Sequence, residues 1–200
     1  MTRPLRIVVA DDEPDMRDYF RKILPRLGHQ VLATAESGHD LVDLCRKAEP
    51  DLVITDIKMP DLDGIDAAVQ IYRETPLPVI LVSAYHDPEL VARAEADHIL
   101  GYLVKPIKQS DLEPAIVLAM RRFEQFEALR KEAADLRQAL ADRKVIERAK
   151  GLLMKKVGLD EQEAFRRLQK LAMDGNRKMA EVAHMVITAE EAFQPKAKTV

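Results

Sequence analysis

The first 110 residues alternate between five short apolar runs and amphipathic stretches with helical spacing. The apolar runs are Leu5–Ala10, Gln30–Ala35, Leu52–Thr55, Val79–Val82 and Gly101–Val104. The helical patterns lie between them, around residues 15–27, 38–47, 64–73 and 88–96. Because the runs are short and rich in β-branched residues, they are typical of buried parallel strands. Parallel strands need helical crossovers, so we expect an α/β domain with a five-stranded sheet covered by helices on both faces.

After Pro106 the pattern changes, and apolar residues recur at spacings of three and four. They are Leu112, Ile116, Ala119, Phe123 and Phe126 and, after a slip in phase, Leu129, Ala133, Leu136 and Leu140. Ser110 and Glu113 have the spacing of a capping box, which predicts the start of a helix. A seam between charged flanks is typical of a coiled coil, so we expect a long helix that pairs with a second copy of the chain. The alternative is that the seam folds back on its own domain.

The last 50 residues show three apolar helical faces. Their members are Val145, Ile146, Ala149, Leu152 and Leu153, then Ala164, Phe165, Leu168, Leu171 and Ala172, then Met179, Val182, Ala183, Val186 and Ile187. Gly158 predicts a helix end, and Asp160 with Glu163 predicts a capping box at the next start. Three facing stripes predict a small all-α three-helix bundle. We therefore divide the chain into residues 1–115, a linker helix over 116–142, a bundle over 143–192 and a flexible tail over 193–200.

The single cysteine, Cys45, excludes an internal disulfide framework and a cysteine-rich zinc site. The N-terminal residues turn acidic after a few apolar positions, unlike a signal peptide. No stretch approaches the roughly 20 apolar residues of a membrane span. We therefore expect a cytoplasmic protein with no membrane partner.

Polar residues follow four of the five predicted strands. Asp11 and Asp12 follow the first, Asp56 the third, Ser83 the fourth and Lys105 the fifth. In an open α/β sheet, ligands bind at the carboxyl ends of the strands. Each residue alone also fits a helix cap or a loop, but the whole set favours a site. Carboxylates that converge repel one another unless a cation joins them, and an oxygen site suits Mg²⁺.

This set of groups suits the binding of a phosphoryl group. The metal and the Lys105 ammonium neutralise phosphoryl oxygens, and the Ser83 hydroxyl donates a hydrogen bond. The Asp56 carboxylate can then act as a nucleophile and form an acyl phosphate. A phosphatase of this kind would also need a substrate-selecting cap and a second catalytic acid, and the sequence shows neither.

Four segments carry a resemblance to the receiver domain of two-component response regulators. They are Ala10–Glu13, Asp56–Gly64, Val82–Ala84 and Tyr102–Pro106. The resemblance covers residues 5–120 and implies a flavodoxin-like sheet, for which the strand order 2-1-3-4-5 is typical. It also implies a sensor histidine kinase as partner. A receiver is a phosphoacceptor regulator, not an enzyme, with phosphoryl transfer and hydrolysis only at its own aspartate.

The resemblance assigns a role to each matching residue. It makes Asp56 the phosphoacceptor and Lys105 the partner of the phosphoryl group. Asp11, Asp12 and Asp56 would hold Mg²⁺, with the backbone carbonyl of Lys58 as a further ligand. Ser83 and Tyr102 would be the switch residues.

The bundle is basic, whereas the first part of the chain is acidic. Residues 1–122 hold 15 Lys and Arg against 21 Asp and Glu, and residues 143–192 hold 11 against 8. Such an asymmetry indicates two functions in one chain. Phe165 is the only aromatic residue among the basic ones and lies on an apolar face, which argues against a base-stacking sheet platform. Charge alone leaves open a solvated surface or a DNA-binding helix-turn-helix.

The segment Arg143–Met154 resembles the opening of the ANTAR domain, an RNA-binding module of transcription antiterminators. Ala164, Phe165, Leu168, Ala172, Met173, Asn176 and Ala183 continue the pattern, whereas Gln169 stands where the family more often has Arg. We expect RNA contacts from Arg143, Arg148, Lys150, Arg166, Arg167, Lys170, Arg177 and Lys178.

The resemblance implies a regulator whose phosphorylation controls binding to tandem RNA hairpins and promotes antitermination. We expect a homodimer through the coiled coil, with phosphorylation biasing its formation. The alternatives are a DNA-binding transcriptional regulator and an interaction-only dimeric signalling protein.

Overall fold

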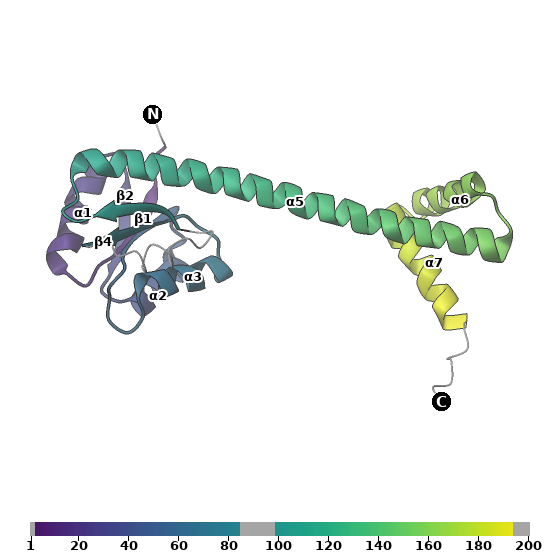
Figure 1. Cartoon of the computed structure of the whole chain (residues 1–200), viewed down its shortest axis with the longest axis horizontal. Helices are drawn as coiled ribbons and strands as arrows, with labels where there is room; N and C mark the ends of the chain where they lie inside the picture. Colours follow the sequence, from purple (N-terminus) through teal and green to yellow (C-terminus); the bar gives the residue numbers. More distant parts are fainter. Residues whose placement is uncertain (1–2, 85–98, 194–200) are drawn as a thin grey trace. The chain divides into compact units, whose positions relative to one another are not determined.

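A computed structural model describes residues 3–84 and 99–193 of the chain (Figure 1). Five strands form one parallel sheet in the order β2-β1-β3-β4-β5. They are β1 (Arg6–Ala10), β2 (Gln30–Ala35), β3 (Leu52–Asp56), β4 (Val79–Ser83) and β5 (Ile99–Val104). The predicted sheet and its order are therefore confirmed. The helix expected around 88–96 and nearly all of the expected tail lie outside the described residues.

Helices cover both faces of the sheet, as predicted. On one face, α1 (Pro14–Arg26) and the start of α5 (Gln109–Val157) pack on a core that includes Phe20, Leu24 and Ile116. On the other face, α2 (Gly38–Ala48) and α3 (Gly64–Glu74) pack on a core that includes Leu41 and Cys45. Central strand β3 is buried along its whole length, which explains its continuous apolar run.

The beginning of α5 differs from the prediction. The helix starts at Gln109, so Ser110 lies inside it and is not its cap. Instead, the Lys108 N–H donates to Asp111 Oδ2 at 3.3 Å, and the Ser110 hydroxyl donates to Asp111 Oδ1. The capping box predicted for Ser110 and Glu113 is therefore wrong, because a neighbouring carboxylate competes for the same groups.

The apolar seam of α5 divides into a buried and an exposed part. Leu112, Ile116 and Ala119 are buried in the core beside α1, so the fold-back alternative holds for these turns. Leu129 and Leu136 are each 65% exposed and Leu140 is 56% exposed. The same spacing thus serves two environments, which sequence periodicity alone does not distinguish.

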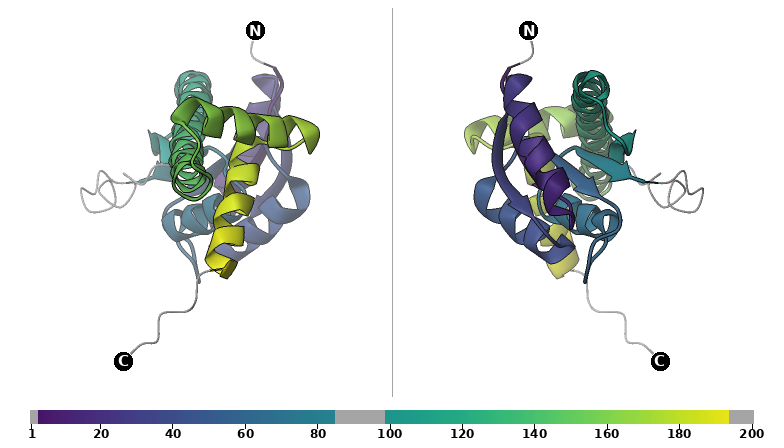
Figure 2. Two further views of the ribbon diagram at one scale, coloured as in Figure 1. Left: turned by 90° about the vertical axis from the view of Figure 1, so that its right-hand side faces the viewer. Right: turned by 90° about the vertical axis from the view of Figure 1, so that its left-hand side faces the viewer.

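The chain forms two compact units, residues 1–128 and 129–200, and α5 contributes to both. The second unit consists of the end of α5, α6 (Glu161–Asp174) and α7 (Met179–Phe193) (Figure 2). These three helices share a core around Ala149, Leu168 and Ala183. The capping box of Asp160 and Glu163 is present, with both hydrogen bonds formed. Gly158 has φ +76° at the end of α5, as expected of a helix-terminating glycine. The predicted three-helix bundle is confirmed.

Candidate functional site

The carboxyl ends of β1, β3 and β5 bring three predicted site residues together. Lys105 Nζ lies 2.7 Å from Asp56 Oδ2 and 3.0 Å from Asp11 Oδ2. β1 lies beside β3 in parallel, with Ala10 opposite Thr55, and therefore Asp11 and Asp56 emerge at the same edge. The proximity predicted from the strand-end positions is present.

Asp56 is the last residue of β3 and is only 7% exposed. Its Oδ1 accepts hydrogen bonds from the N–H groups of Ile57 at 2.6 Å and Lys58 at 3.4 Å. Its Oδ2 accepts from the Lys105 ammonium. One oxygen is thus fixed by the backbone, and the other faces a cation.

Asp11 is fully buried, and its two oxygens differ in their contacts. Oδ1 accepts from the Glu13 N–H at 3.0 Å. Oδ2 lies within ion-pair distance of Lys105 but off the direction of a hydrogen bond, and accepts none among the described residues. Burial raises the pKa of Asp11 above its usual value, and only part of this is offset by Lys105. Although burial works against its ammonium, pairing with Asp56 and Asp11 raises the pKa of Lys105.

The site fits a hard divalent cation. Asp11, Asp12, Glu13 and Asp56 each offer a carboxylate oxygen, and these atoms lie within 4.8 Å of one another. A divalent ion would satisfy the buried Asp11 Oδ2, and carboxylate oxygens are the ligands that Mg²⁺ prefers. The role predicted for the Lys58 carbonyl stays a prediction.

Two residues of the site were missed in the sequence. Glu13 Oε1 lies 3.2 Å from Lys105 Nζ. Arg17, on the first turn of α1, donates from Nη1 to the carbonyl oxygens of Asp11 at 2.7 Å and Asp12 at 3.0 Å. Its Nη2 bonds Glu36 Oε1 at 2.8 Å, and the side chain is only 11% exposed. The guanidinium therefore fixes the backbone of the loop after β1 that contains Asp11 and Asp12, which we call the acidic loop. In the sequence, only the position of Arg17 one helical turn after that loop could have indicated this role.

The predicted switch residues lie on neighbouring strands. Ser83 ends β4 and is buried, and its carbonyl accepts from the Lys105 N–H at 2.8 Å. Tyr102 lies on β5, half-buried against the core that α2 and α3 cover. This backbone bond couples Ser83 to Lys105, but the switching roles of both residues stay predictions.

Two glycines allow the loop after β3 to approach its neighbours closely. A Cβ on Gly64 would overlap the carbonyl oxygen of Asp56 and reach Thr55 Oγ1 at 3.0 Å. A Cβ on Gly38 would overlap the carbonyl oxygen of Leu62. The Gly64 N–H donates to the Ile57 carbonyl at 2.9 Å. The loop that follows Asp56 is thus held at both ends by contacts that only glycine permits.

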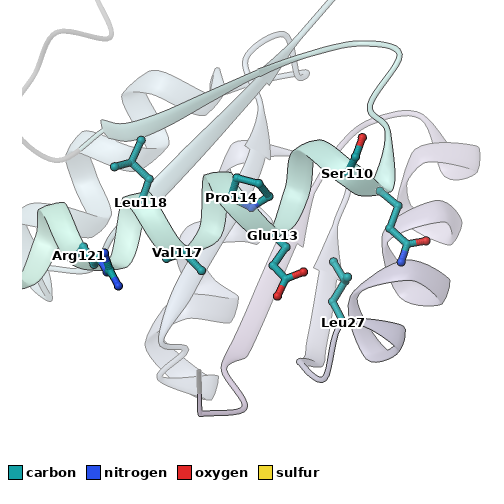
Figure 3. A pocket seen from close by; sticks show the side chains of 8 residues that line it. Leu27, Ser110, Glu113, Pro114, Val117, Leu118 and Arg121 are labelled. Carbon is teal, nitrogen blue, oxygen red and sulfur yellow. The ribbon is translucent and has the colours of Figure 1, made fainter. Parts of the chain in front are cut away.

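A separate cavity of about 700 Å³ lies where the end of α1 meets the first turns of α5 (Figure 3). Leu27, Pro114, Val117 and Leu118 give it an apolar lining, and Glu113 is one of its charged groups. None of its lining residues belongs to the acidic site. Pro114 lies inside α5.

The predicted RNA-contacting residues fall into two groups. Arg143, Arg166, Arg167, Lys170, Arg177 and Lys178 are exposed. Lys150, in contrast, has a side chain only 8% exposed and pairs with Glu161 at 2.8 Å and Glu147 at 3.0 Å. Arg148 is exposed but pairs with Glu191 at 2.8 Å. The Lys150 ammonium is therefore engaged by carboxylates of its own unit, which the count of basic residues did not reveal.

Comparison with known proteins adds the family. Residues 7–117 match the family model of the response regulator receiver domain, and residues 134–187 match that of the ANTAR domain. The chain is 42% identical over 184 residues to the transcriptional regulatory protein PdtaR of Mycobacterium tuberculosis, covering 92% of this chain and 90% of that protein.

Solved structures agree with the fold of the first unit. A response regulator receiver domain protein from Clostridium thermocellum is 32% identical, with a TM-score of 0.55 over 60% of this chain and 97% of that one. A two-component response regulator of the LuxR family from Aurantimonas is 25% identical, with a TM-score of 0.56 over 59% and 86%. Among the described residues, no helix combines the length and apolar character needed to cross a membrane.

Proposed function

This chain belongs to the response regulators that combine a receiver domain with an ANTAR domain, and we propose that phosphorylation of Asp56 controls its binding to RNA hairpins. The observation that carries the proposal is the 2.7 Å contact between Asp56 Oδ2 and Lys105 Nζ beside the other carboxylates. In this proposal the bound hairpins favour an antiterminated transcript, and the protein acts in the cytoplasm.

The chemistry at Asp56 is transfer from a phosphohistidine of a sensor kinase. Asp56 Oδ2 attacks phosphorus, the P–N bond to the imidazole breaks, and an acyl phosphate forms on the aspartate. Asp11, Asp12 and Asp56 would hold Mg²⁺, which supplies charge neutralisation for phosphoryl oxygens when bound. The Lys105 ammonium already lies against Oδ2 and would pair with the new phosphoryl group. The Ile57 and Lys58 N–H groups keep Oδ1 in place.

Labelling with a small phosphodonor such as acetyl phosphate tests this step. Wild type should incorporate one phosphoryl group in the presence of Mg²⁺, whereas Asp56→Asn should incorporate none. Asp15→Asn, at an exposed carboxylate on α1, is the matched control and should label like wild type. Equal labelling of wild type and Asp56→Asn would refute the assignment of Asp56.

The proposed RNA contacts come from exposed cations of the second unit. Helices that present Lys and Arg bind phosphates, and such binding weakens steeply with salt. Arg167→Ala with Lys170→Ala should weaken binding to a two-hairpin RNA and reduce the salt slope by about one for each lost phosphate contact. Lys156→Ala is the control, because Lys156 is not among the expected RNA contacts and its ammonium pairs with Glu190 at 2.9 Å. Affinity that is the same with and without acetyl phosphate, or a preference for duplex DNA over RNA, would contradict the proposal.

We also propose that two copies of the chain pair along the exposed part of the α5 seam. Leu129, Leu136 and Leu140 present apolar surface at coiled-coil spacing. Two linked RNA-binding units gain avidity on tandem hairpins without any new contact. Sedimentation of the phosphorylated protein should show a dimer that Leu136→Asp abolishes. Glu132→Gln, on the same helix, should leave it intact, and a monomer under all conditions would exclude the pairing.

A further inference from the structure

A cavity of about 500 Å³ lies at the surface of the second unit. Lys150 lines it from α5, and Glu161, Gln162, Phe165 and Arg166 line it from the first turns of α6. These α6 residues lie within one and a half helical turns at spacings that place them on a common side. The volume falls in the usual range of ligand pockets, which is about 300–1,000 Å³.

Phe165 does not belong to the core of the bundle. The sequence pattern placed it on the apolar face of α6, but its side chain is 41% exposed. The core cluster of this unit uses Leu168 and Ala172 from the same helix, and Phe165 is not among the residues packed on it. The prediction that Phe165 is a core residue is therefore wrong, and its ring is available at the cavity.

The charges around the cavity suit a neutral heterocycle better than a phosphate. The Lys150 ammonium is occupied by Glu161 at 2.8 Å and Glu147 at 3.0 Å. Pairing with Lys150 lowers the pKa of Glu161, so this carboxylate is ionised at neutral pH. A phosphate in the cavity would meet that negative charge. A nucleobase instead offers N–H donors to the Glu161 carboxylate and both donors and acceptors to the Gln162 amide.

We propose that this cavity receives an unpaired RNA base, which stacks on the Phe165 ring. The inference rests on the proposed RNA binding and deepens it, since it assigns the contact that reads a base while exposed cations contact phosphates. Unpaired bases of RNA loops are recognised by stacking on aromatic rings or on Arg guanidinium planes and by hydrogen bonds along their edges. Phe165 and Arg166 supply the planes, and Gln162 and Glu161 supply the edge contacts.

Three substitutions on α6 test the stacking. The probe is a two-hairpin RNA that is selected, from a pool with randomised loops, for binding to the wild-type protein at fixed salt. Phe165→Leu keeps an apolar side chain but removes the aromatic plane, and should weaken binding about 5- to 150-fold. Phe165→Tyr keeps the plane and should bind like wild type. Leu171→Ala, at a residue 42% exposed on the same helix, should also bind like wild type, and circular dichroism checks that all variants fold.

An RNA series with single abasic loop positions identifies the stacked base. One abasic position should weaken wild type by the same factor as Phe165→Leu, and on that RNA the variant should lose no further affinity. If wild type binds the hairpins but Phe165→Leu binds equally well, or if Phe165→Tyr is weakened as much as Phe165→Leu, the stacking is refuted while RNA binding stands. If wild type selects no hairpin RNA from the pool, the proposed function falls and the stacking with it.

Discussion

Gly64 is the position at which the smallest change should have the largest effect on the receiver domain. In Gly64→Ala, the new methyl group would overlap the Asp56 carbonyl oxygen, which is a backbone atom, and the position of the methyl group is itself fixed by the backbone. No side chain can rotate away to make room. Cβ atoms essentially never lie within 3.0 Å of such an atom, so β3 and the start of α3 must separate by about 1 Å.

The expected loss of stability combines three effects. Overpacking of this kind costs about 1–3 kcal/mol. The separation also weakens the Gly64 N–H bond to the Ile57 carbonyl, which contributes about 0.5–1.5 kcal/mol. Alanine restricts the unfolded chain and returns about 0.4–1 kcal/mol. The net loss is about 2 kcal/mol, which lowers the midpoint of thermal unfolding of this unit by roughly 6–10 °C.

Gly151→Ala is the matched control, because Gly151 lies inside α5, six residues before the end at Val157, and its Cβ would meet nothing within 4 Å. Here alanine should stabilise the second unit by about 0.5–1 kcal/mol. Calorimetry of both variants measures the two opposite shifts. A Gly64→Ala protein that unfolds at or above the wild-type temperature would refute the reasoning, because the loop would then not need its close approach.

Of three further predictions, two concern groups around the acidic loop and one concerns His29, near the amino-terminal ends of β1 and β2. Asp11→Asn should raise the unfolding temperature in the absence of metal, because the raised pKa of Asp11 means that its ionised form destabilises the fold at neutral pH. Mg²⁺ should raise the unfolding temperature of wild type but not that of the variant. An equal response of both proteins to Mg²⁺ would contradict this prediction. Burial lowers the pKa of His29, whose Nδ1 accepts a hydrogen bond from the Leu5 N–H, so the free energy of unfolding should fall as the pH drops below about 6.5. Denaturant titrations at several pH values should show that His29→Asn flattens this dependence. An unchanged slope would exclude His29 as its cause. Arg17→Met removes the hydrogen bonds to the carbonyl oxygens of Asp11 and Asp12, and should weaken Mg²⁺ binding about 10-fold or more in calorimetric titrations. The exposed Arg21→Met should bind Mg²⁺ like wild type. Equal Mg²⁺ affinities of Arg17→Met and wild type would show that these hydrogen bonds have no effect on the site.

The acidic site was predictable because it depends on the ends of strands. Apolar runs locate strands, and parallel strands bring their carboxyl ends to one edge, so the positions of Asp11, Asp56 and Lys105 sufficed. Arg17 was not predictable in the same way. Its role depends on the path of its side chain under the loop and on the partner Glu36, which lies 19 residues further along the chain.

Burial of individual helix residues was harder to predict than the helices themselves. The spacing of Leu112 and Ile116 is that of Leu136 and Leu140, yet the first pair lies in the receiver core and the second is exposed. Periodicity reports which face is apolar but not what covers it. Phe165 shows the same limit, since it has core spacing on α6 but stands at the edge of the apolar face.

Charge counts overestimated the basic surface of the bundle. Lys150 has its acidic partners at positions 147 and 161, and the second of these is brought near by the turn between α5 and α6. A count of residues includes Lys150 in the positive charge of the bundle, but in the fold two carboxylates neutralise its ammonium. Such cancellation depends on tertiary contacts and is visible only once the helices are placed.

The lone thiol of this chain has a practical consequence. Cys45 lies on α2 and is packed in the core between this helix and the sheet. Burial raises the pKa of its thiol to about 12, so at neutral pH the thiol is almost entirely in the unreactive protonated form. Oxidants are therefore poor candidates for an input signal to this regulator. The wild-type protein is also a ready background for labelling, because a cysteine engineered at position 136 would be the one accessible thiol among the described residues. Its crosslinking would test the proposed pairing of two α5 helices and report their register.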